Sequence, residues 1–197
     1  MPSSSGQANK VVMITGAGAG LGEAMARRFY QSGAQIVACD VVADRIQALA
    51  DSLGPEVMPV TMDVTSEADW ADAVHQTMER FGRVDVLINN AGVAVAGRLE
   101  DTSLDDWRWV MEIDLIGVML GCQAVLPMLR EQKSGHIINV ASVAGLAGAP
   151  EINAYGTAKA GVVALSEMLR AEVKLDGIEV SALCPAFVKT RLTETMR

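Results

Sequence analysis

The sequence predicts an α/β domain built on a doubly wound parallel sheet. Short apolar segments rich in Val and Ile alternate along the chain with longer segments whose apolar residues recur at helical spacing. Several short segments are apolar almost throughout, which is typical of strands buried on both faces. Short connections between such elements favour right-handed crossovers, with helices on both faces of the sheet. In this fold class, ligands bind beyond the carboxyl ends of the strands.

The expected strands and helices alternate strictly along the chain. In the first expected helix, Met25, Phe29 and Tyr30 form one apolar stripe. Ser66, with Asp69 three residues later, indicates the start of another helix. We expect strands at 10–15, 35–40, 57–62, 84–89, 136–141 and 178–183, and helices at 20–33, 44–53, 67–81, 104–132 and 154–175.

Length and composition restrict the class of function. The 197 residues agree with one domain, and we expect a loose polar tail at 1–9 before a domain at 10–197. Half of the residues are hydrophobic, which excludes an intrinsically disordered chain. A net charge of −8 and an aromatic content of 4% argue against a nucleic-acid partner.

The sequence also favours a cytoplasmic protein without a metal site or a membrane partner. Cys39, Cys122 and Cys184 lie far apart and form no zinc-binding pattern, so we expect reduced thiols. The N-terminal residues contain no apolar segment of a signal peptide. The longest apolar stretch, 115–129, is too short to span a membrane and is expected to be a buried helix.

A glycine-rich segment, TGAGAGLG at 15–22, follows the first strand and opens the first helix. Glycine permits positive φ angles and lets backbone N–H groups approach a pyrophosphate, which the helix N-terminus also attracts. Strict GxGxxG spacing is absent because residue 21 is Leu, and Gly16, Gly20 and Gly22 instead fit GxxxGxG. The position of this segment between a strand and a helix predicts dinucleotide binding.

Asp40 closes the second strand and favours NAD over NADP. A carboxylate there can accept hydrogen bonds from both hydroxyls of an adenosine ribose and repel a 2′-phosphate. The glycine segment carries no Lys or Arg, and Arg45 is the basic residue nearest to Asp40. The alternative is a solvated carboxylate at a strand end.

Tyr155 and Lys159 share one face of an expected helix, because they lie four residues apart. Ser142 follows the fifth strand, so all three side chains are expected at the same sheet edge as the glycine segment. With these motifs the sequence resembles the short-chain dehydrogenase/reductase family, of Rossmann type, over nearly its whole length. The matching motifs are TGAGAGLG at 15–22, Asp63-Val64, Asn89-Asn90-Ala91-Gly92, Ser142, Tyr155 with Lys159, and the segment 184–190.

The resemblance implies a secondary alcohol–ketone oxidoreductase that uses NAD, with Ser142, Tyr155, Lys159 and Asp114 as its catalytic set. Tyr155 would exchange a proton with the substrate oxygen, which Ser142 would polarise. An ordinary tyrosine has a pKa of about 10, so the Lys159 ammonium would have to favour the phenolate. The implied cofactor-binding residues are Gly16, Gly20, Leu21, Gly22, Asp40, Asp63, Val64, Asn89, Ala91, Gly92, Tyr155, Lys159, Pro185, Val188 and Thr190.

The sequence departs from the family pattern at three places. Asp114 stands where the family has an Asn that helps to hold a water next to the lysine, and Ala186 replaces a glycine. The chain stops at Arg197, where the family continues into a substrate lid and a further strand. A truncated chain, an omitted tail and a natural short form all fit this ending, which is expected to leave the sixth strand as a sheet edge.

The expected substrate is a neutral secondary alcohol or ketone. The residues expected near it are apolar, and no Arg clamp for an anion is evident. Two other functions stay open: a catalytically impaired NAD-binding sensor or scaffold, which Asp114 favours, and an epimerase or dehydratase, which the lack of a large substrate domain opposes. The residues expected near the substrate are Val93, Val95, Val143, Ala144, Leu146 and Phe187.

The resemblance also implies a homodimer or homotetramer. Helices at 104–132 and 154–175 would pack against a second subunit. An apolar stripe suits that contact, although packing inside one subunit explains it almost as well. The stripe consists of Val118, Cys122, Val125 and Leu129.

Overall fold

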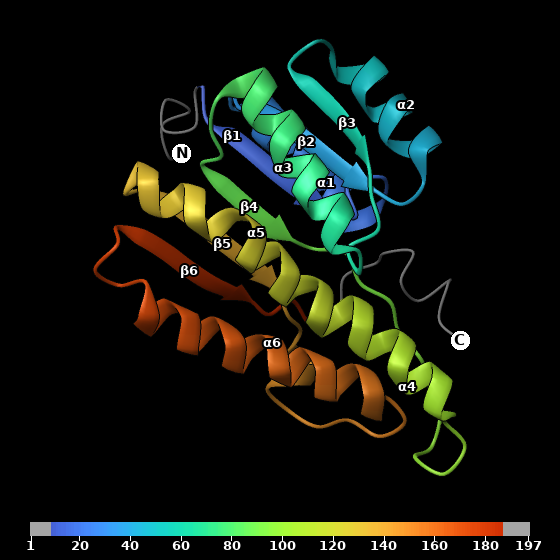
Figure 1. The fold of residues 1–197 in the computed structure, drawn as a ribbon. Helices are drawn as coiled ribbons and strands as arrows, with labels where there is room; N and C mark the ends of the chain where they lie inside the picture. Colours follow the sequence, from blue (N-terminus) through green and yellow to red (C-terminus); the bar gives the residue numbers. More distant parts are fainter. Residues whose placement is uncertain (1–8, 187–197) are drawn as a thin grey trace.

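The computed structural model of the chain describes residues 9–186 and confirms the predicted fold class. Over this range a parallel sheet runs in the order β3-β2-β1-β4-β5-β6, with helices on both faces (Figure 1). The strands are β1 (Val11–Thr15), β2 (Gln35–Asp40), β3 (Val57–Thr61), β4 (Val86–Asn89), β5 (Gly135–Val140) and β6 (Ile178–Leu183). The helices are α1 (Gly20–Gln31), α2 (Ala43–Leu53), α3 (Glu67–Phe81), α4 (Leu104–Met111), α5 (Gly117–Gln132) and α6 (Asn153–Glu172), with a π-helical turn at Glu112–Ile116 and a 3-10 turn at Val143–Gly145.

The order of the strands fixes where a ligand can bind. The chain builds β1, β2 and β3 outward in one direction, then crosses back to place β4 on the other side of β1. The loops that follow β1 and β4 therefore diverge at the carboxyl edge of the sheet and leave a crevice between them. In Figure 1 the arrowheads of all labelled strands point toward this edge.

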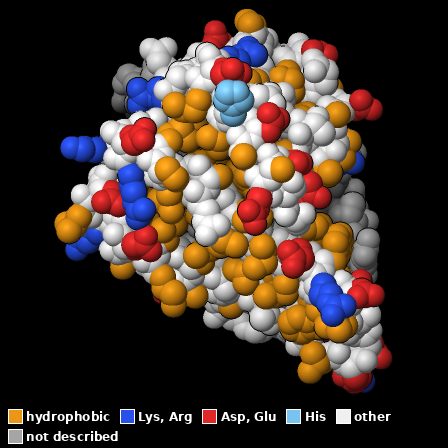
Figure 2. All heavy atoms as spheres, in the orientation of Figure 1, with side chains coloured by type: hydrophobic (Ala, Val, Ile, Leu, Met, Phe, Trp, Pro, Cys, Tyr) orange, Lys and Arg blue, Asp and Glu red, His pale blue; other side chains and the backbone are white. Residues whose placement is uncertain are grey.

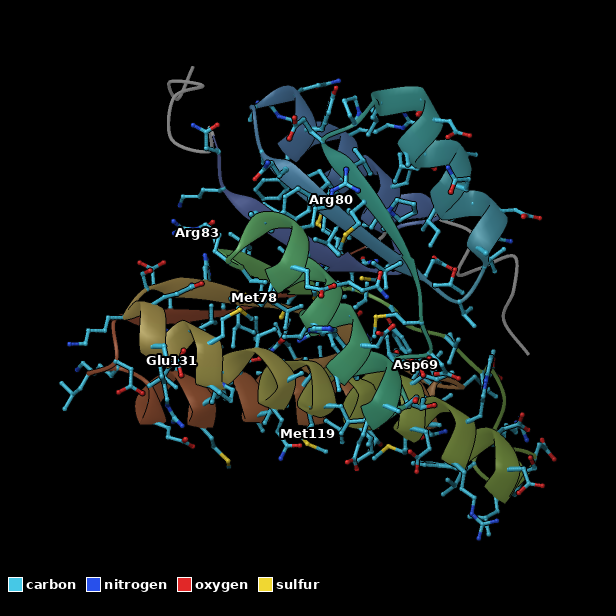
Figure 3. The ribbon with its side chains drawn as sticks, turned by 45° about the horizontal axis from the view of Figure 1, so that its top comes forward. Asp69, Met78, Arg80, Arg83, Met119 and Glu131 are labelled. Atoms are coloured by element: carbon cyan, nitrogen blue, oxygen red, sulfur yellow. The ribbon has the colours of Figure 1, made fainter. Side chains whose placement is uncertain are left out.

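Two apolar cores hold the three layers together. One core packs α3, α5 and α6 on one face of the sheet, with Trp70, Val125 and Val162 buried in it. The other core packs α1 and α2 on the opposite face, with Ala26 and Ile46 buried. In Figure 3, α3, which carries Asp69 at its start, lies beside α5, which carries Met119.

Local side-chain contacts explain several element boundaries. The Ser66 hydroxyl accepts a hydrogen bond from the Asp69 N–H at 3.2 Å, which confirms the expected helix start. β4 begins at Val86 and not at residue 84, as the apolar pattern suggested. The Asp85 carboxylate accepts a hydrogen bond from the Val11 N–H at 2.9 Å. A side-chain oxygen therefore replaces the strand carbonyl that would otherwise pair with Val11.

The expected helix at 104–132 is continuous, but it is not regular. The π-helical turn Glu112–Ile116 separates α4 from α5. Within the described residues, the stretch Leu104–Gln132 is long and apolar enough to cross a membrane, a test that a core helix also passes. The stripe of Val118, Cys122, Val125 and Leu129 is buried in the core of the single subunit, so core packing accounts for it.

Candidate active site

A cleft of about 570 Å³ lies at the carboxyl edge of the sheet. It extends along the carboxyl ends of the strands, from the residues after β3 to the residues after β6. The cleft therefore crosses the whole width of the described sheet. A volume of this size is in the range of sites that bind cofactors and small molecules.

The glycine loop forms the wall of the cleft at β1. Gly16 has φ of 62° and Gly20 has φ of 58°, conformations that favour glycine. Gly22 lies against the loop so closely that a Cβ atom there would collide with the Gly16 carbonyl oxygen. Gly16 and Gly20 line the cleft, whereas Gly22 only allows α1 to approach the loop.

Thr15 and Asn90 fix this loop to the turn after β4. The Thr15 hydroxyl accepts hydrogen bonds from the N–H groups of Asn90 and Ala91, at 2.9 and 3.0 Å. The Asn90 side chain in turn donates to the Thr15 carbonyl at 2.9 Å. These contacts set the width of the crevice between β1 and β4, and Asn90 lines it.

Asp40 lies at the end of β2, at the edge of the cleft. Its two carboxylate oxygens accept the N–H groups of Gly18, at 2.9 Å, and Val42, at 3.0 Å. A carboxylate has about four acceptor positions, so each oxygen retains the capacity to accept from a ligand hydroxyl. Arg45 also lines this end of the cleft.

Asp63 and Val64 follow β3 and line the same end of the cleft. The Asp63 carboxylate accepts the Thr65 N–H at 2.9 Å, while the Asp63 N–H donates to Asp69 at 2.8 Å. The N–H of Asp63 and the Ser66 hydroxyl hold the pKa of Asp69 below its ordinary value. Figure 3 shows Asp69 at the start of α3, next to this loop.

Ser142, Tyr155 and Lys159 meet at the opposite end of the cleft. Lys159 Nζ donates to the Val140 carbonyl at 3.0 Å and lies 5.7 Å from the centre of the Tyr155 ring. Ser142 follows β5, and its hydroxyl oxygen accepts the Ala144 N–H at 3.1 Å. Gly145 lets this loop pack on α6, because a Cβ there would lie 2.6 Å from the backbone of Lys159.

Asp114 is fully buried beside Lys159. Its Oδ2 atom lies 3.1 Å from Lys159 Nζ, and its Oδ1 atom accepts the Val93 N–H at 2.8 Å. Burial raises the pKa of the Asp114 carboxyl, while the Lys159 ammonium and the Val93 N–H oppose that rise. The π-helical turn carries Asp114 to this position.

Asn89 is placed outside the cleft, in the core between the sheet and α5. Its side chain donates to Asn139 at 2.9 Å, and Asn139 donates to Ser166 at 3.0 Å. The Cys122 thiol also donates to Asn139, at 3.7 Å, and burial raises its pKa to about 11. This buried network joins β4, β5, α5 and α6 behind the site.

The structure brings most of the expected site residues together. Asn90, Trp109 and Ile113 also line the cleft and were not among the expected site residues. Of the residues expected near the substrate, Val93 lines the cleft, whereas Val95, Val143, Ala144 and Leu146 do not; Phe187, Val188 and Thr190 lie outside the described residues. The expected residues that line the cleft are Gly16, Gly20, Leu21, Asp40, Asp63, Val64, Ala91, Gly92, Asp114, Ser142, Tyr155, Lys159 and Pro185.

Comparison with known proteins identifies relatives of the whole described fold. Residues 10–197 match the family model described as short chain dehydrogenase. The chain is 42% identical to meso-2,3-butanediol dehydrogenase of Serratia marcescens over 186 residues, 94% of this chain and 74% of that protein. It is 37% identical to 2-(R)-hydroxypropyl-CoM dehydrogenase of Xanthobacter autotrophicus over 193 residues, 94% and 77% of the two chains.

Solved structures give the same result. A short-chain dehydrogenase/reductase from Burkholderia phymatum, in complex with NAD, matches with a TM-score of 0.92 and 37% identity, over 95% of this chain and 69% of that one. The 3-ketoacyl-(acyl-carrier-protein) reductase from Brucella melitensis, complexed with NADH, matches with a TM-score of 0.93 and 32% identity, over 98% and 80%. Sequence, fold and cleft agree, and the chain belongs to the short-chain dehydrogenase/reductase family of oxidoreductases.

Proposed function

We propose that the protein is an NAD-dependent oxidoreductase that interconverts a neutral secondary alcohol and a ketone. The observation that carries this proposal is the common cleft of Ser142, Tyr155 and Lys159 with Asp40 and the glycine loop. A proton-transferring group, a charge partner and a dinucleotide cradle thus share one cavity.

The residues of the cleft fit NAD. The glycine loop and the N-terminus of α1 suit a pyrophosphate, because backbone N–H groups can approach it where no Cβ intervenes. Asp40 retains acceptor capacity for ribose hydroxyls and would repel a 2′-phosphate. Asp63 and Val64, which line the cleft, would hold the adenine ring, and Lys159 and Tyr155 would hold the second ribose.

When bound, the nicotinamide ring supplies or accepts the hydride of the reaction. Tyr155 exchanges the proton with the substrate oxygen, and the Lys159 ammonium favours the phenolate form. Ser142 Oγ already accepts a hydrogen bond from Ala144, so its hydroxyl proton remains for the substrate oxygen. That donation stabilises negative charge as it develops on the oxygen.

The walls of the catalytic end support a neutral, apolar substrate. Val93, Trp109 and Ile113 line it together with Tyr155. Among the described residues that line this end, the cation is Lys159, and Asp114 already pairs with it. A substrate carboxylate or phosphate would therefore find no free positive partner there.

The proposal is tested by measuring the absorbance change of NADH with a panel of secondary alcohols and ketones. The assay uses protein whose intact mass has been verified. We expect turnover of at least one neutral member, and loss of that turnover in Tyr155→Phe. Calorimetric titration of NAD and NADP runs in parallel, and tighter binding of NADP would contradict the cofactor assignment.

The second candidate function is an NAD-binding sensor or scaffold that has lost turnover. The buried carboxylate of Asp114 beside Lys159 favours it, because that charge opposes activation of Tyr155. Binding of NAD without turnover across the whole panel would support this function instead.

We also propose that the protein forms a homodimer or homotetramer. Figure 2 shows hydrophobic side chains between the charged ones on the face that carries α5 and α6. Leu104 on α4 and Met168 on α6 are 64% and 72% exposed. Light scattering tests the assembly, and we expect Met168→Lys to shift it toward the monomer.

A further inference from the structure

Asp114 and Lys159 are the charged side chains buried in the part of the chain that the structure describes. The two groups come from different elements, the π-helical turn and α6, and meet at 3.1 Å. Removing two charges from water is unfavourable unless they compensate each other, so each of the two groups depends on the other to stay charged.

Each end of this pair holds a different part of the cleft. Lys159 Nζ is fixed between the Val140 carbonyl at the end of β5 and the Asp114 carboxylate. The other oxygen of Asp114 accepts the N–H of Val93, which belongs to the wall of the cleft after β4. Gly92 leaves the room for this contact, because a Cβ there would lie 3.0 Å from Asp114 Oδ2. The carboxylate therefore links the lysine to the substrate end of the cleft.

We propose that Asp114 is a positioning residue for the proposed reaction: it fixes Lys159 Nζ and Val93, and its charge opposes the effect of the Lys159 ammonium on Tyr155. This inference rests on the proposed role of Tyr155 as the proton-transferring group. A lone ammonium 5.7 Å from the ring would favour the phenolate strongly. A carboxylate in contact with that ammonium partly cancels its field, so the phenol keeps its proton to a higher pH.

The other charged groups around this pair are exposed or lie at the far end of the cleft. On the π-helical turn Glu112 is exposed, and on α4 Asp105 and Arg108 are exposed while Asp106 is half-buried. Before α6, Glu151 is exposed. Asp40, Arg45 and Asp63 line the end near β2 and β3, three to four strand spacings from β5, where solvent and distance weaken their effect.

The chain allows a direct test, because Tyr30 and Tyr155 are its two tyrosines. A spectrophotometric titration of the phenolate band, with Tyr155→Phe subtracted, isolates the ionisation of Tyr155 without cofactor or substrate. We expect Asp114→Asn to lower the titration midpoint of Tyr155. The direction follows because a negative charge near the phenol disfavours the phenolate.

Glu112→Gln is the matched control, because it removes the same charge from an exposed position of the same turn. We expect the midpoint of Tyr155 to change little in this variant. The double variant Asp114→Asn with Lys159→Gln removes both charges, and we expect its midpoint to return toward that of the wild type. This variant keeps the test available when Asp114→Asn folds poorly, because removing both members of a buried pair is better tolerated.

An unchanged or higher midpoint of Tyr155 in folded Asp114→Asn would overturn the inference, and so would a double variant that titrates well below the wild type. With an accepted substrate, kcat/KM for alcohol oxidation should rise at lower pH in Asp114→Asn than in the wild type. Asp114→Ala also leaves the Val93 N–H unpaired, so we expect a higher KM in that variant only. Absence of turnover with every substrate contradicts the proposed function but leaves the tyrosine titration valid.

Discussion

At its β2 end the cleft carries a half-buried carboxylate that backbone N–H groups hold, whereas at its β5 end it carries two charged side chains that are buried against each other. Asp40 is half-buried at the first end and is satisfied by the N–H groups of Gly18 and Val42. Lys159 and Asp114 at the second end are buried and form an ion pair at 3.1 Å. The geometry of the first end therefore depends on the path of the backbone, and the electrostatics of the second end depend on which charged side chains are present.

This difference determines what a substitution does at each end. A charge at the half-buried end is screened by water, so removing it changes ligand affinity more than stability. A charge removed from the buried end leaves its partner without compensation, so it changes stability and chemistry together. The predictions below test this contrast, in order of decreasing effect.

Tyr155→Phe should reduce kcat by about 10²- to 10⁴-fold, the usual contribution of a general acid–base group. The phenyl ring keeps its shape, so the dissociation constant for NAD should change little. Steady-state kinetics and calorimetry on the same preparation measure the two quantities. A variant with nearly normal kcat would show that another group transfers the proton.

Lys159→Met should lower the free energy of unfolding by about 3–5 kcal/mol, because Asp114 would remain buried without its partner. Urea denaturation measures this loss. Arg130→Met is the matched control at an exposed pair with Glu172 and Asp176, and we expect a much smaller loss of stability there because solvent screens exposed charges. Equal losses in the two variants would contradict the contrast between buried and exposed charges.

The loss in Lys159→Met should also depend on pH. Burial raises the pKa of the Asp114 carboxyl above its ordinary 3.8, so the folded state holds this proton more tightly than the unfolded state. Stability therefore falls as pH rises from 3.8 to the raised pKa of Asp114 in the folded state. The Lys159 ammonium opposes that rise in pKa, so its removal extends this pH range upward. We expect a smaller loss at about pH 5 than at about pH 8.

Asp40→Ala should weaken NAD binding by about 10- to 100-fold, because hydrogen bonds to a charged group are lost. NADP binding should weaken less, since the repulsion of a 2′-phosphate is lost as well. Asp44→Ala, which removes an exposed carboxylate from the first turn of α2, is the control for net charge. Calorimetric titrations measure the affinities of both variants for NAD and NADP. An unchanged ratio of the two affinities in Asp40→Ala would show that Asp40 does not determine the choice of cofactor.

The buried thiols should make the protein less stable in alkali. Burial raises the pKa of Cys39 to about 12 and of Cys122 to about 11, from 9.0. Above pH 9 the unfolded chain loses these protons first, so stability falls by about 1.4 kcal/mol per pH unit for each thiol. Urea denaturation at several pH values above 9 should show that the free energy of unfolding falls less steeply with pH in Cys39→Ala than in the wild type. An unchanged slope would contradict the raised pKa of Cys39.

The fold was predictable because the strands carry a strong local signal. Val11 to Thr15 are all buried, and an unbroken run of this kind reads as a central parallel strand. The start of β4 was not predictable, because the Asp85 side chain takes a hydrogen bond that a strand carbonyl would otherwise accept. The π-helical turn was also not predictable, since one extra residue leaves an apolar helix pattern almost unchanged.

The site was predictable where a motif fixes both position and chemistry, as at the glycine loop and at Tyr155 with Lys159. Asn89 belongs to such a motif, yet its side chain points into the core network, and neighbouring Asn90 faces the cleft. Alternation along an extended strand end separates the two, which a motif does not reveal. Trp109 depends on the rotation of α4 about its axis, and only the packed structure sets that rotation.

The π-helical turn has a consequence for changes in chain length. Each residue of an α-helix advances the side-chain direction by about 100°. Deleting one residue between Glu112 and Ile116 would restore a regular helix, but it would rotate α4 by that angle relative to α5. Trp109 would leave the cleft while the buried face of α5 stayed in place. Apart from the buried Asp114, engineered libraries should therefore accept substitutions in this segment more readily than insertions or deletions.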